Sequence, residues 1–305
     1  VGVVTTKSIG LEPREGNREP VYSQYAPGCF VNAVGLTNPG AHQSLALLAA
    51  LNIPKDRFLL TSIFGGSIEE FVTVAKIMAP VSDGLELNLS CPHAKGYGMA
   101  MGQDPDLVRQ ITAAVKAVVD IPVIPKLTPN TPDIAKIAKA AIAGGADGLC
   151  AINTAGPGYT SSHGYPVLSN GAGGMSGKGV LPIGLQCVRD IAAVTDCPII
   201  GCGGVSSAAD VRAYFDAGAA VVGVGSSLTG LTTDEVSAYF KALSNDLDTD
   251  NNRAESHIRY DIDMNFRPVI LLENKRICED ICILTFDRKI NIQAGEFVFL
   301  WIPGV

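Results

Sequence analysis

The sequence lacks any long apolar run, and it contains few charged residues for its length. Charged side chains make up 17% of the 305 residues, whereas hydrophobic side chains make up 47%. The longest apolar runs are the size of a strand, well short of the ~18 residues that a membrane span needs. The opening VGVVTTKSIG also lacks the charged and then apolar layout of a signal peptide. We therefore expect a soluble, cytoplasmic protein with a large buried core.

The sequence also lacks paired cysteines and an excess of positive charge. None of the eight cysteines forms a CxxC pair, and Cys278 and Cys282, four residues apart, have no neighbouring metal ligands in the sequence. The formal net charge of −7 argues against nucleic acid as a partner. We expect no metal site and no nucleic-acid or membrane partner. A locally positive pocket for a small anion remains compatible with this charge.

Short β-branched runs alternate with segments of helical spacing, and we expect this alternation of strands and helices throughout the barrel domain. Residues 104–119, for example, place apolar side chains three and four positions apart, as helices that cover a parallel sheet do. Near-continuous apolar strands indicate a sheet covered on both faces, which means either a doubly wound sheet or a closed barrel. The predicted strands are 2–8, 58–64, 84–90, 121–128, 147–154, 197–204 and 219–226.

Seven strands are one short of the eight that a closed barrel needs. The chain opens within a strand and without an initiator Met. We therefore predict an α/β fold, a (β/α)8 TIM barrel whose first strand lies upstream of residue 1.

The character of the sequence changes after Leu243. Residues 244–257 are polar, have little to bury and predict a linker. The strand-like segments RPVILLEN, ICILTFD and GEFVFLWIP follow, separated by turns without helical spacing. This pattern is typical of an antiparallel barrel or sandwich. We predict a barrel domain over 1–243 and the truncated start of an antiparallel β-barrel domain over 258–305.

Polar residues and glycines end the predicted strands, where barrel enzymes carry their chemistry. A lysine at the end of an apolar strand is costly unless it meets an anion or an acceptor, so Lys7 and Lys126 are candidate ligand contacts. Glycines after the last two strands can bring backbone N–H groups to a phosphate. The strand ends carry Lys7 with Ser8, Ser62, Asn88 with Cys91, Lys126, Asn153 with Thr154, Gly203 with Gly204, and Gly225 with Ser226.

Cys91 follows the strand-like run GLELNL and precedes a glycine-rich stretch, KGYGMAMGQD. A thiol at the carboxyl end of a buried strand, at the root of a loop, is a candidate acid or base. The alternative is a small buried hydrophobe, which is what a lone cysteine usually is.

The order and spacing of eight segments resemble the dihydroorotate dehydrogenase family over nearly all of residues 1 to 243. Each segment alone is weak evidence, but the set is specific. The segments are TKSI with Lys7, NAVGLTNPG (32–40), NLSCP (88–92), PKLTPN (125–130), INTAG (152–156), GGMSG (173–177), GCGGV (201–205) and VGVGS (222–226).

The resemblance implies an FMN enzyme that oxidises dihydroorotate to orotate in de novo pyrimidine (UMP) biosynthesis, with Cys91 as the base. It implies that the pyrimidine is held by Lys7, Asn32, Ala33, Val34, Gly35, Leu36, Asn88, Asn153 and Thr154. It implies flavin contacts from Lys7, Ser8, Ser62, Asn88, Lys126, Ile152, Gly177, Gly203, Gly204, Gly225 and Ser226.

The chemistry of these side chains agrees with the implied roles. A cationic or hydrogen-bonding environment lowers the pKa of a thiol toward neutrality, which suits Cys91 as a base. Lys126 would stabilise the negative charge of the reduced cofactor. The amides of Asn88 and Asn153 offer donors and acceptors that match the alternating N–H and C=O edge of a pyrimidine.

The segment GEFVFLWIPG (295–304) resembles the opening of the ferredoxin-reductase-type flavin barrel in the electron-transfer subunit of NAD-linked dihydroorotate dehydrogenases. This second resemblance implies a fusion of two subunits in which electrons pass on to NAD. FAD and an iron–sulfur cluster would then belong to the part of that domain beyond Val305. An unrelated small β-domain is the alternative. Family members usually pair their barrels, so a homo-oligomer is also expected.

Two residues depart from the family pattern. His93 stands where typical members have Asn, and Ser62 stands where NAD-linked members usually have Asn. Both departures resemble the pyrimidine-reducing domain of dihydropyrimidine dehydrogenases, so reduction of uracil or thymine is the alternative function. A barrel that binds flavin without turnover is a more remote alternative.

Overall fold

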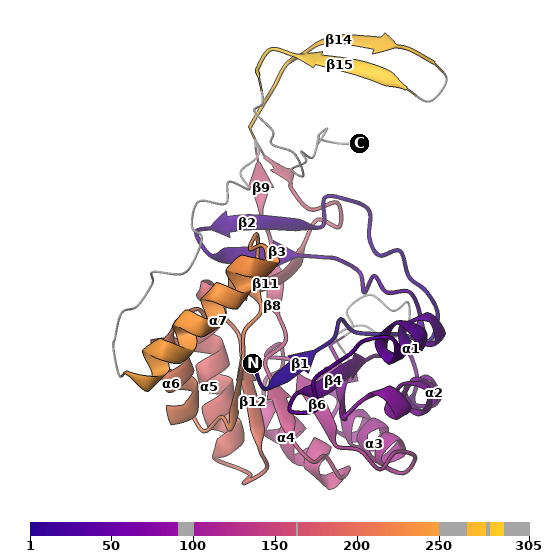
Figure 1. Cartoon of the computed structure of the whole chain (residues 1–305), viewed down its shortest axis with the longest axis vertical. Helices are drawn as coiled ribbons and strands as arrows, with labels where there is room; N and C mark the ends of the chain where they lie inside the picture. Colours follow the sequence, from indigo (N-terminus) through magenta and orange to yellow (C-terminus); the bar gives the residue numbers. More distant parts are fainter. Residues whose placement is uncertain (91–100, 163, 250–266, 279–280, 290–305) are drawn as a thin grey trace.

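The computed structural model describes residues 1–90, 101–162, 164–249, 267–278 and 281–289. Its central element is a seven-stranded parallel sheet that curls into part of a barrel (Figure 1). The strands follow the order β1-β4-β5-β6-β7-β12-β13, and the seven predicted strands are all present. They are β1 (Val3–Thr5), β4 (Phe58–Ile63), β5 (Gly84–Asn88), β6 (Val123–Leu127), β7 (Leu149–Ala151), β12 (Ile199–Cys202) and β13 (Val221–Gly223).

Helices cover the outer face of this sheet (Figure 1). Their amino ends carry the caps that the sequence provides: Ser67 accepts a hydrogen bond from Glu70 N, and Ser207 and Thr232 begin capping boxes. The α-helices are α1 (Ala41–Ala49), α2 (Ile68–Met78), α3 (Pro105–Lys116), α4 (Ile134–Ala143), α5 (Leu181–Ala192), α6 (Ala208–Asp216) and α7 (Thr233–Asp248). Short 3₁₀ helices are η1 (Ala79–Val81), η2 (Met101–Gln103), η3 (Lys178–Val180) and η4 (Ser226–Leu228). No described helix is both long and apolar enough to cross a membrane.

The two faces of the sheet differ in chemistry, as strand β5 shows. Successive side chains of a strand point to opposite faces. Leu85 and Leu87 are fully buried and join the core that the helices pack against. Glu86 and Asn88 lie on the other face, which lines the barrel interior. The parallel register continues this pattern, because Asn88 is paired with Lys126, and Lys126 with Cys150.

A four-stranded antiparallel sheet, which sequence analysis missed, interrupts the alternation of strands and helices. Its order is β2-β3-β11-β8, with β2 (Tyr22–Ala26), β3 (Cys29–Asn32), β11 (Gly173–Gly177) and β8 (Ala155–Gly158), and a small hairpin of β9 (Ser161–Ser162) and β10 (Tyr165–Pro166) follows β8. The expectation of alternating units throughout was therefore wrong here. The strands β8 and β11 read AGPG and GGMSG, which have no apolar periodicity to detect. Glycine is needed at Gly173 because a Cβ there would overlap the backbone of Asn32.

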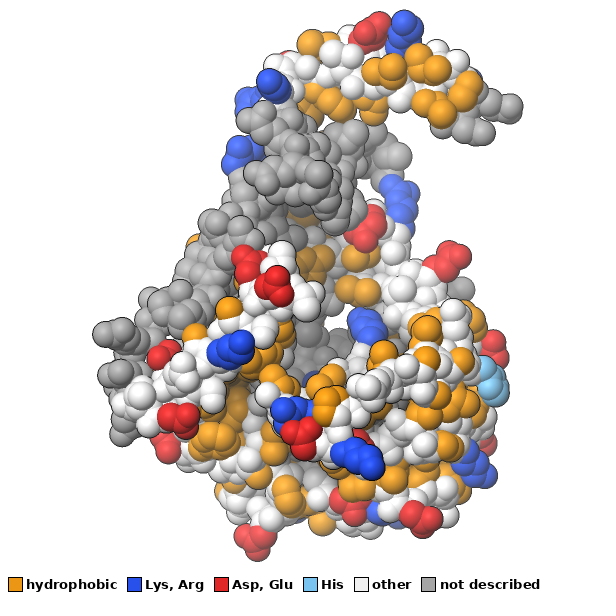
Figure 2. Space-filling model, viewed as in Figure 1, with side chains coloured by type: hydrophobic (Ala, Val, Ile, Leu, Met, Phe, Trp, Pro, Cys, Tyr) orange, Lys and Arg blue, Asp and Glu red, His pale blue; other side chains and the backbone are white. Residues whose placement is uncertain are grey.

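Part of the predicted linker is helical. Helix α7 continues to Asp248, five residues into the range 244–257, and its side chains Tyr239 and Leu243 are buried. An antiparallel hairpin of β14 (Leu271–Arg276) and β15 (Cys282–Phe286) lies in the predicted second domain. Apolar side chains gather on this hairpin (Figure 2), and Leu272 keeps 64% of its surface exposed. The segment 295–304 lies outside the described residues.

Candidate active site

A chain of polar side chains links the carboxyl ends of four parallel strands. The hydroxyls of Ser8 and Ser62 are 2.9 Å apart, and Asn88 Nδ2 donates to Ser8 Oγ over 2.9 Å. Asn153 Nδ2 donates to Asn88 Oδ1 over 3.1 Å. The backbone N–H of Thr154 in turn donates to Asn153 Oδ1. The structure thus brings together residues that are up to 146 positions apart in the sequence, and all five were predicted for the site.

Lys126 lies beside this chain and forms an ion pair inside the barrel. Its Nζ is 3.5 Å from Glu86 Oε2, with side-chain exposures of 21% for the lysine and 5% for the glutamate. Burial by itself would lower the pKa of Lys126, but Cys150, Cys202 and Glu86 outweigh burial and raise that pKa well above its ordinary value. Lys126 is therefore a cation at neutral pH. Lys7, the other predicted lysine, is exposed at the end of β1.

Two thiols extend the polar interior below Lys126. Cys150 Sγ and Cys202 Sγ are 3.8 Å apart, and Cys202 Sγ donates to the carbonyl of Ile152 over 3.3 Å. The hydrogen bond to Cys202 and burial raise the pKa of Cys150. The hydrogen bond from Cys150, followed by the charge of Lys126, lowers the pKa of Cys202 to about 6. The contact between the two sulfurs therefore moves their pKa values in opposite directions.

The glycines predicted to hold a phosphate form close backbone contacts. Gly203 and Gly204 have φ angles of +126° and +77°, which L side chains rarely adopt. A Cβ on Gly204 would lie 2.8 Å from the carbonyl oxygen of Gly177. A Cβ on Gly203 would lie 3.1 Å from Ile152 Cγ1. Four residues predicted to contact the flavin therefore meet next to the end of β12.

Gly225 and Ser226 follow β13, which pairs with β12 through Cys202 and Gly223. Gly225 is exposed, and an added Cβ would meet no protein atom within 4 Å. Open space therefore lies next to the backbone at this point, beside the strand that carries Gly203 and Gly204.

The segment 32–36 is shaped by a neighbouring loop and by positive φ angles. Asn17 donates from its backbone N–H to Val34 O over 3.0 Å and from its side chain to Ala33 O over 2.7 Å. Gly35 and Leu36 have φ angles of +83° and +60°. Asn32, at the end of β3, donates to Gly174 O over 3.4 Å. The antiparallel sheet thereby connects 32–36 to the rest of the site.

Thr154 connects the same sheet to the polar chain. A Cβ on Gly174 would overlap the side chain of Thr154, so the two residues are packed closely. Asn130 Nδ2 donates to Thr154 O over 3.0 Å, and Asn130 Oδ1 accepts from Gly156 N over 2.8 Å. Asn130 therefore fixes the backbone of two site segments.

Cys91 and His93 lie outside the described residues. Ser90, the residue before Cys91, is described, and its Oγ is buried without a hydrogen-bond partner among the described residues. An orphaned hydroxyl at the end of β5 is unusual in a folded protein. It shows that hydrogen-bonding capacity remains unused beside Asn88.

Sequence reasoning missed Glu86 and Asn130. Glu86 interrupts the apolar run GLELNL, and a charge within a buried strand is as costly as the two lysines that were singled out. A charge within an apolar run is thus a signal that identifies such a residue. Asn130 ends the segment PKLTPN, but the carbonyl of Thr154 that it contacts is 24 positions away and cannot be read from the sequence.

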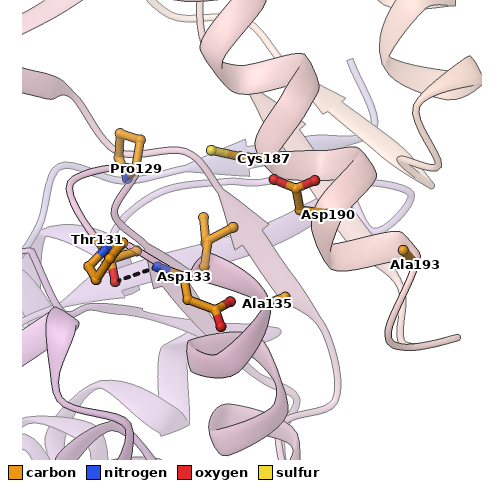
Figure 3. A pocket seen from close by; sticks show the side chains of 9 residues that line it. Pro129, Thr131, Asp133, Ala135, Cys187, Asp190 and Ala193 are labelled. Atoms are coloured by element: carbon orange, nitrogen blue, oxygen red, sulfur yellow. Dashed lines mark hydrogen bonds between the residues drawn. The ribbon is translucent and has the colours of Figure 1, made fainter.

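A separate pocket of about 310 Å³ lies between the start of α4 and helix α5 (Figure 3). It includes Asp133 and Asp190, and no residue predicted for the site lines it. Asp133 caps α4 by accepting from Lys136 N, and Asp190 accepts from Gln186 Nε2. Both carboxylates thus already have a structural role, which makes this pocket a gap between helices rather than the centre of chemistry.

The fold and the site are typical of an α/β-barrel enzyme, with a lysine, amides, hydroxyls and glycines at the carboxyl edge of the parallel sheet. Comparison with known protein families identifies the family. The dihydroorotate dehydrogenase family matches residues 1–244. The chain belongs to the dihydroorotate dehydrogenase family.

Curated relatives of the chain share about half of its residues over most of its length. One is "Dihydroorotate dehydrogenase B (NAD(+)), catalytic subunit" of Methanosarcina mazei, which is 48% identical over 74% of this chain and 73% of that protein. The protein of the same name from Pyrococcus horikoshii is 48% identical over 74% of each chain. That from Methanocella arvoryzae is 43% identical over 74% of this chain and 75% of the relative.

Proposed function

We propose that this chain performs the catalytic-subunit reaction of an NAD-linked dihydroorotate dehydrogenase, the oxidation of dihydroorotate to orotate in pyrimidine biosynthesis. The observation that carries this proposal is the hydrogen-bonded chain from Ser8 through Asn88 to Asn153, with Lys126 beside it. These are the positions that carry the family resemblance. The family match over residues 1–244 supports the same reaction.

The family implies an FMN cofactor, and the described residues fit one. Gly225 leaves open space beside the backbone, and Gly203 and Gly204 adopt positive φ angles, as glycines do in backbone turns that bind a phosphate. Lys126 supplies a cation for the ring of the flavin. Bound FMN would supply the acceptor for a hydride from the substrate. We infer that Lys7, Ser8, Ser62, Asn88, Ile152, Gly177 and Ser226 complete this binding site.

The pyrimidine is held by amides and by the segment 32–36 in this proposal. Asn88 and Asn153 present donors and acceptors that fit the edge of a ring with alternating N–H and C=O groups. Asn130 keeps Thr154 in place through its carbonyl. Lys7 remains exposed at the end of β1 and is available to an anionic substituent of the ring.

Cys91 is the proposed base. Its sulfur, as thiolate, takes a proton from one ring carbon while the neighbouring carbon loses a hydride, so the ring gains a double bond and the thiol gains one proton. A thiol works as a base near neutral pH when its surroundings lower its pKa. Asn88 precedes Cys91 by three residues and is paired with Lys126 across the sheet, so we infer that these two residues contribute to that effect.

A second function, the reduction of uracil or thymine, rests on His93 and Ser62. Ser62 is buried and shares a hydrogen bond with Ser8, so it serves the polar chain with either substrate. The compared relatives are all named as dihydroorotate dehydrogenases, which favours the first function.

We also propose that residues from 258 onward begin an electron-transfer domain that passes electrons on to NAD. The name "catalytic subunit" of the relatives implies an electron-transfer partner, and the antiparallel hairpin β14–β15 agrees with a β-domain. Its exposed apolar side chains would be covered by the rest of such a domain.

Anaerobic bleaching of the flavin in the full-length protein tests the proposal. Dihydroorotate should bleach the FMN absorbance, dihydrouracil should not, and the Cys91→Ser variant should bleach far more slowly with dihydroorotate. Cys278→Ser, which alters an exposed thiol on the hairpin side, is the matched control and should behave as the parent. Bleaching by dihydrouracil alone would move the protein to the second function, and unchanged bleaching in Cys91→Ser would reject the base.

A further inference from the structure

Glu86 is the one charged residue within the described ranges that is almost completely buried, with 3% of the whole residue exposed. It lies on β5, two residues before Asn88, and faces the barrel interior. A buried carboxylate is unfavourable unless a partner compensates its charge, and removal of that partner leaves an uncompensated charge. The partner that the structure provides is Lys126 Nζ, 3.5 Å away.

The environment of Lys126 is built from several strands and leaves one side of the lysine open. Glu86 faces it from β5, Cys150 from β7 and Cys202 from β12, and Tyr214 of α6 lies near Cys202 and donates to Gly203 O over 2.8 Å. Lys126 keeps about a fifth of its side chain exposed, whereas Glu86 keeps 5%. The lysine thus has the carboxylate on its enclosed side and remains accessible elsewhere.

Glu86 is the ion-pair partner of Lys126 in this cluster. The contact between the sulfurs of Cys150 and Cys202 moves their pKa values in opposite directions, so the two thiols do not ionise together. Burial alone would favour the neutral amine of Lys126, and a nearby carboxylate favours the cation. The distance of 3.5 Å also limits where the Lys126 amine can lie relative to Asn88, its neighbour across the sheet.

We propose that Glu86 is a positioning residue, which holds Lys126 in place and in its charged form at the cofactor site. This inference rests on the proposed function, because it assigns the lysine to the bound FMN. Glu86 touches neither cofactor nor substrate in this proposal. It acts through Lys126, so its effect is a change in how the bound flavin responds to pH.

The test is the midpoint potential of bound FMN between pH 6 and pH 10 in the full-length holoenzyme. In the parent, Lys126 stays charged throughout this range. In Glu86→Gln, the carboxylate no longer opposes burial and only the thiols of Cys150 and Cys202 do, so the pKa of Lys126 should fall and we expect the lysine to lose its proton within the range. Below the pH at which Lys126 loses its proton, the uncompensated positive charge of this lysine should place the midpoint potential above the parent value. Above that pH, the potential should fall to the values measured for Lys126→Met, which has no cation at any pH.

A second readout is the affinity for FMN, measured by titration of the apoprotein. The dissociation constant of Glu86→Gln should rise about tenfold between pH 7 and pH 10, because a hydrogen bond from a charged donor is lost. Asp147→Asn is the matched control: Asp147 pairs with Lys116 Nζ at 2.8 Å and accepts from Val123 N, at the start of β7 rather than in the barrel interior. It removes a lysine–carboxylate pair and should leave both readouts unchanged.

The outcomes separate this inference from the proposed function. If Lys126→Met shifts the potential but Glu86→Gln follows the parent profile from pH 6 to pH 10, the role of Glu86 is overturned and the proposed function stands. If Lys126→Met also matches the parent, the cofactor is not at Lys126, and both proposals are overturned. If Glu86→Gln fails to fold, Glu86→Asp replaces it, because this variant shortens the side chain by one methylene and moves the carboxylate away from Lys126. A new inflection in the plot of midpoint potential against pH would support the role of Glu86. A plot that matches the parent would reject that role.

Discussion

Replacement of Gly225 by alanine should weaken FMN binding. In the protein alone, the added Cβ meets nothing within 4 Å, but the φ and ψ angles of −134° and −82° lie outside the α and β regions that L side chains favour. A residue other than glycine in such a conformation lowers the free energy of unfolding by ~1–3 kcal/mol. The same methyl group would occupy the space that the proposed phosphate site needs. We expect an FMN dissociation constant at least ~10-fold higher, or about 1.4 kcal/mol.

Two measurements on the same preparations separate these effects. Urea denaturation of the apoprotein gives the free energy of unfolding, and fluorescence titration with FMN gives the dissociation constant. Gly2→Ala is the control, because Gly2 also has no atom within 4 Å of an added Cβ but precedes β1, at the amino edge of the sheet. Unchanged FMN affinity in Gly225→Ala would show that the cofactor does not approach this backbone, and the reasoning from open space would be refuted.

Two further predictions concern stability. Phe71 is fully buried on α2, so Phe71→Ala should lower the free energy of unfolding, measured by urea denaturation, by ~3–5 kcal/mol. Phe215 is 47% exposed, so Phe215→Ala should lower it by less than ~1 kcal/mol. Similar losses in the two variants would contradict the assigned core. Burial raises the pKa of Cys187 from 9.0 to about 11, so the folded state resists loss of this proton. Its contribution to stability is complete below pH 9 and is lost as the pH rises toward 11. Cys187→Ala should therefore lose less stability between pH 8 and pH 10.5 than the parent, and an equal loss would reject this role.

The parallel sheet and its helices could be predicted because their signals are local. The run GLELNL identifies a buried strand. Ser207 and Thr232 each stand three residues before an acidic residue, a capping-box pattern that indicates the start of a helix. The site residues at strand ends could be predicted for a related reason. Parallel strands bring their carboxyl ends to one edge, so Asn88 and Asn153 had to lie near each other once the strands were found.

The antiparallel sheet could not be predicted by the same means. Strand β3 pairs with β11, so that Asn32 lies opposite Gly174, 142 positions away, and neither strand has an alternating apolar pattern that shows its partner. The close approach there depends on glycines, and glycine in a sequence is equally compatible with a simple turn. The connection of 32–36 to Thr154 therefore emerged only from the tertiary structure.

The sequence by itself determined the seven strands, the helices that cover them and most of the residues at the site's edge. Only the tertiary structure decided that Glu86 pairs with Lys126, that Cys150 lies against Cys202, and that Gly225 borders open space. The physical reason is that apolar periodicity and capping act within a few residues of the chain. Contacts inside a barrel depend on the register between strands and on the curl of the sheet, which join side chains far apart in the sequence.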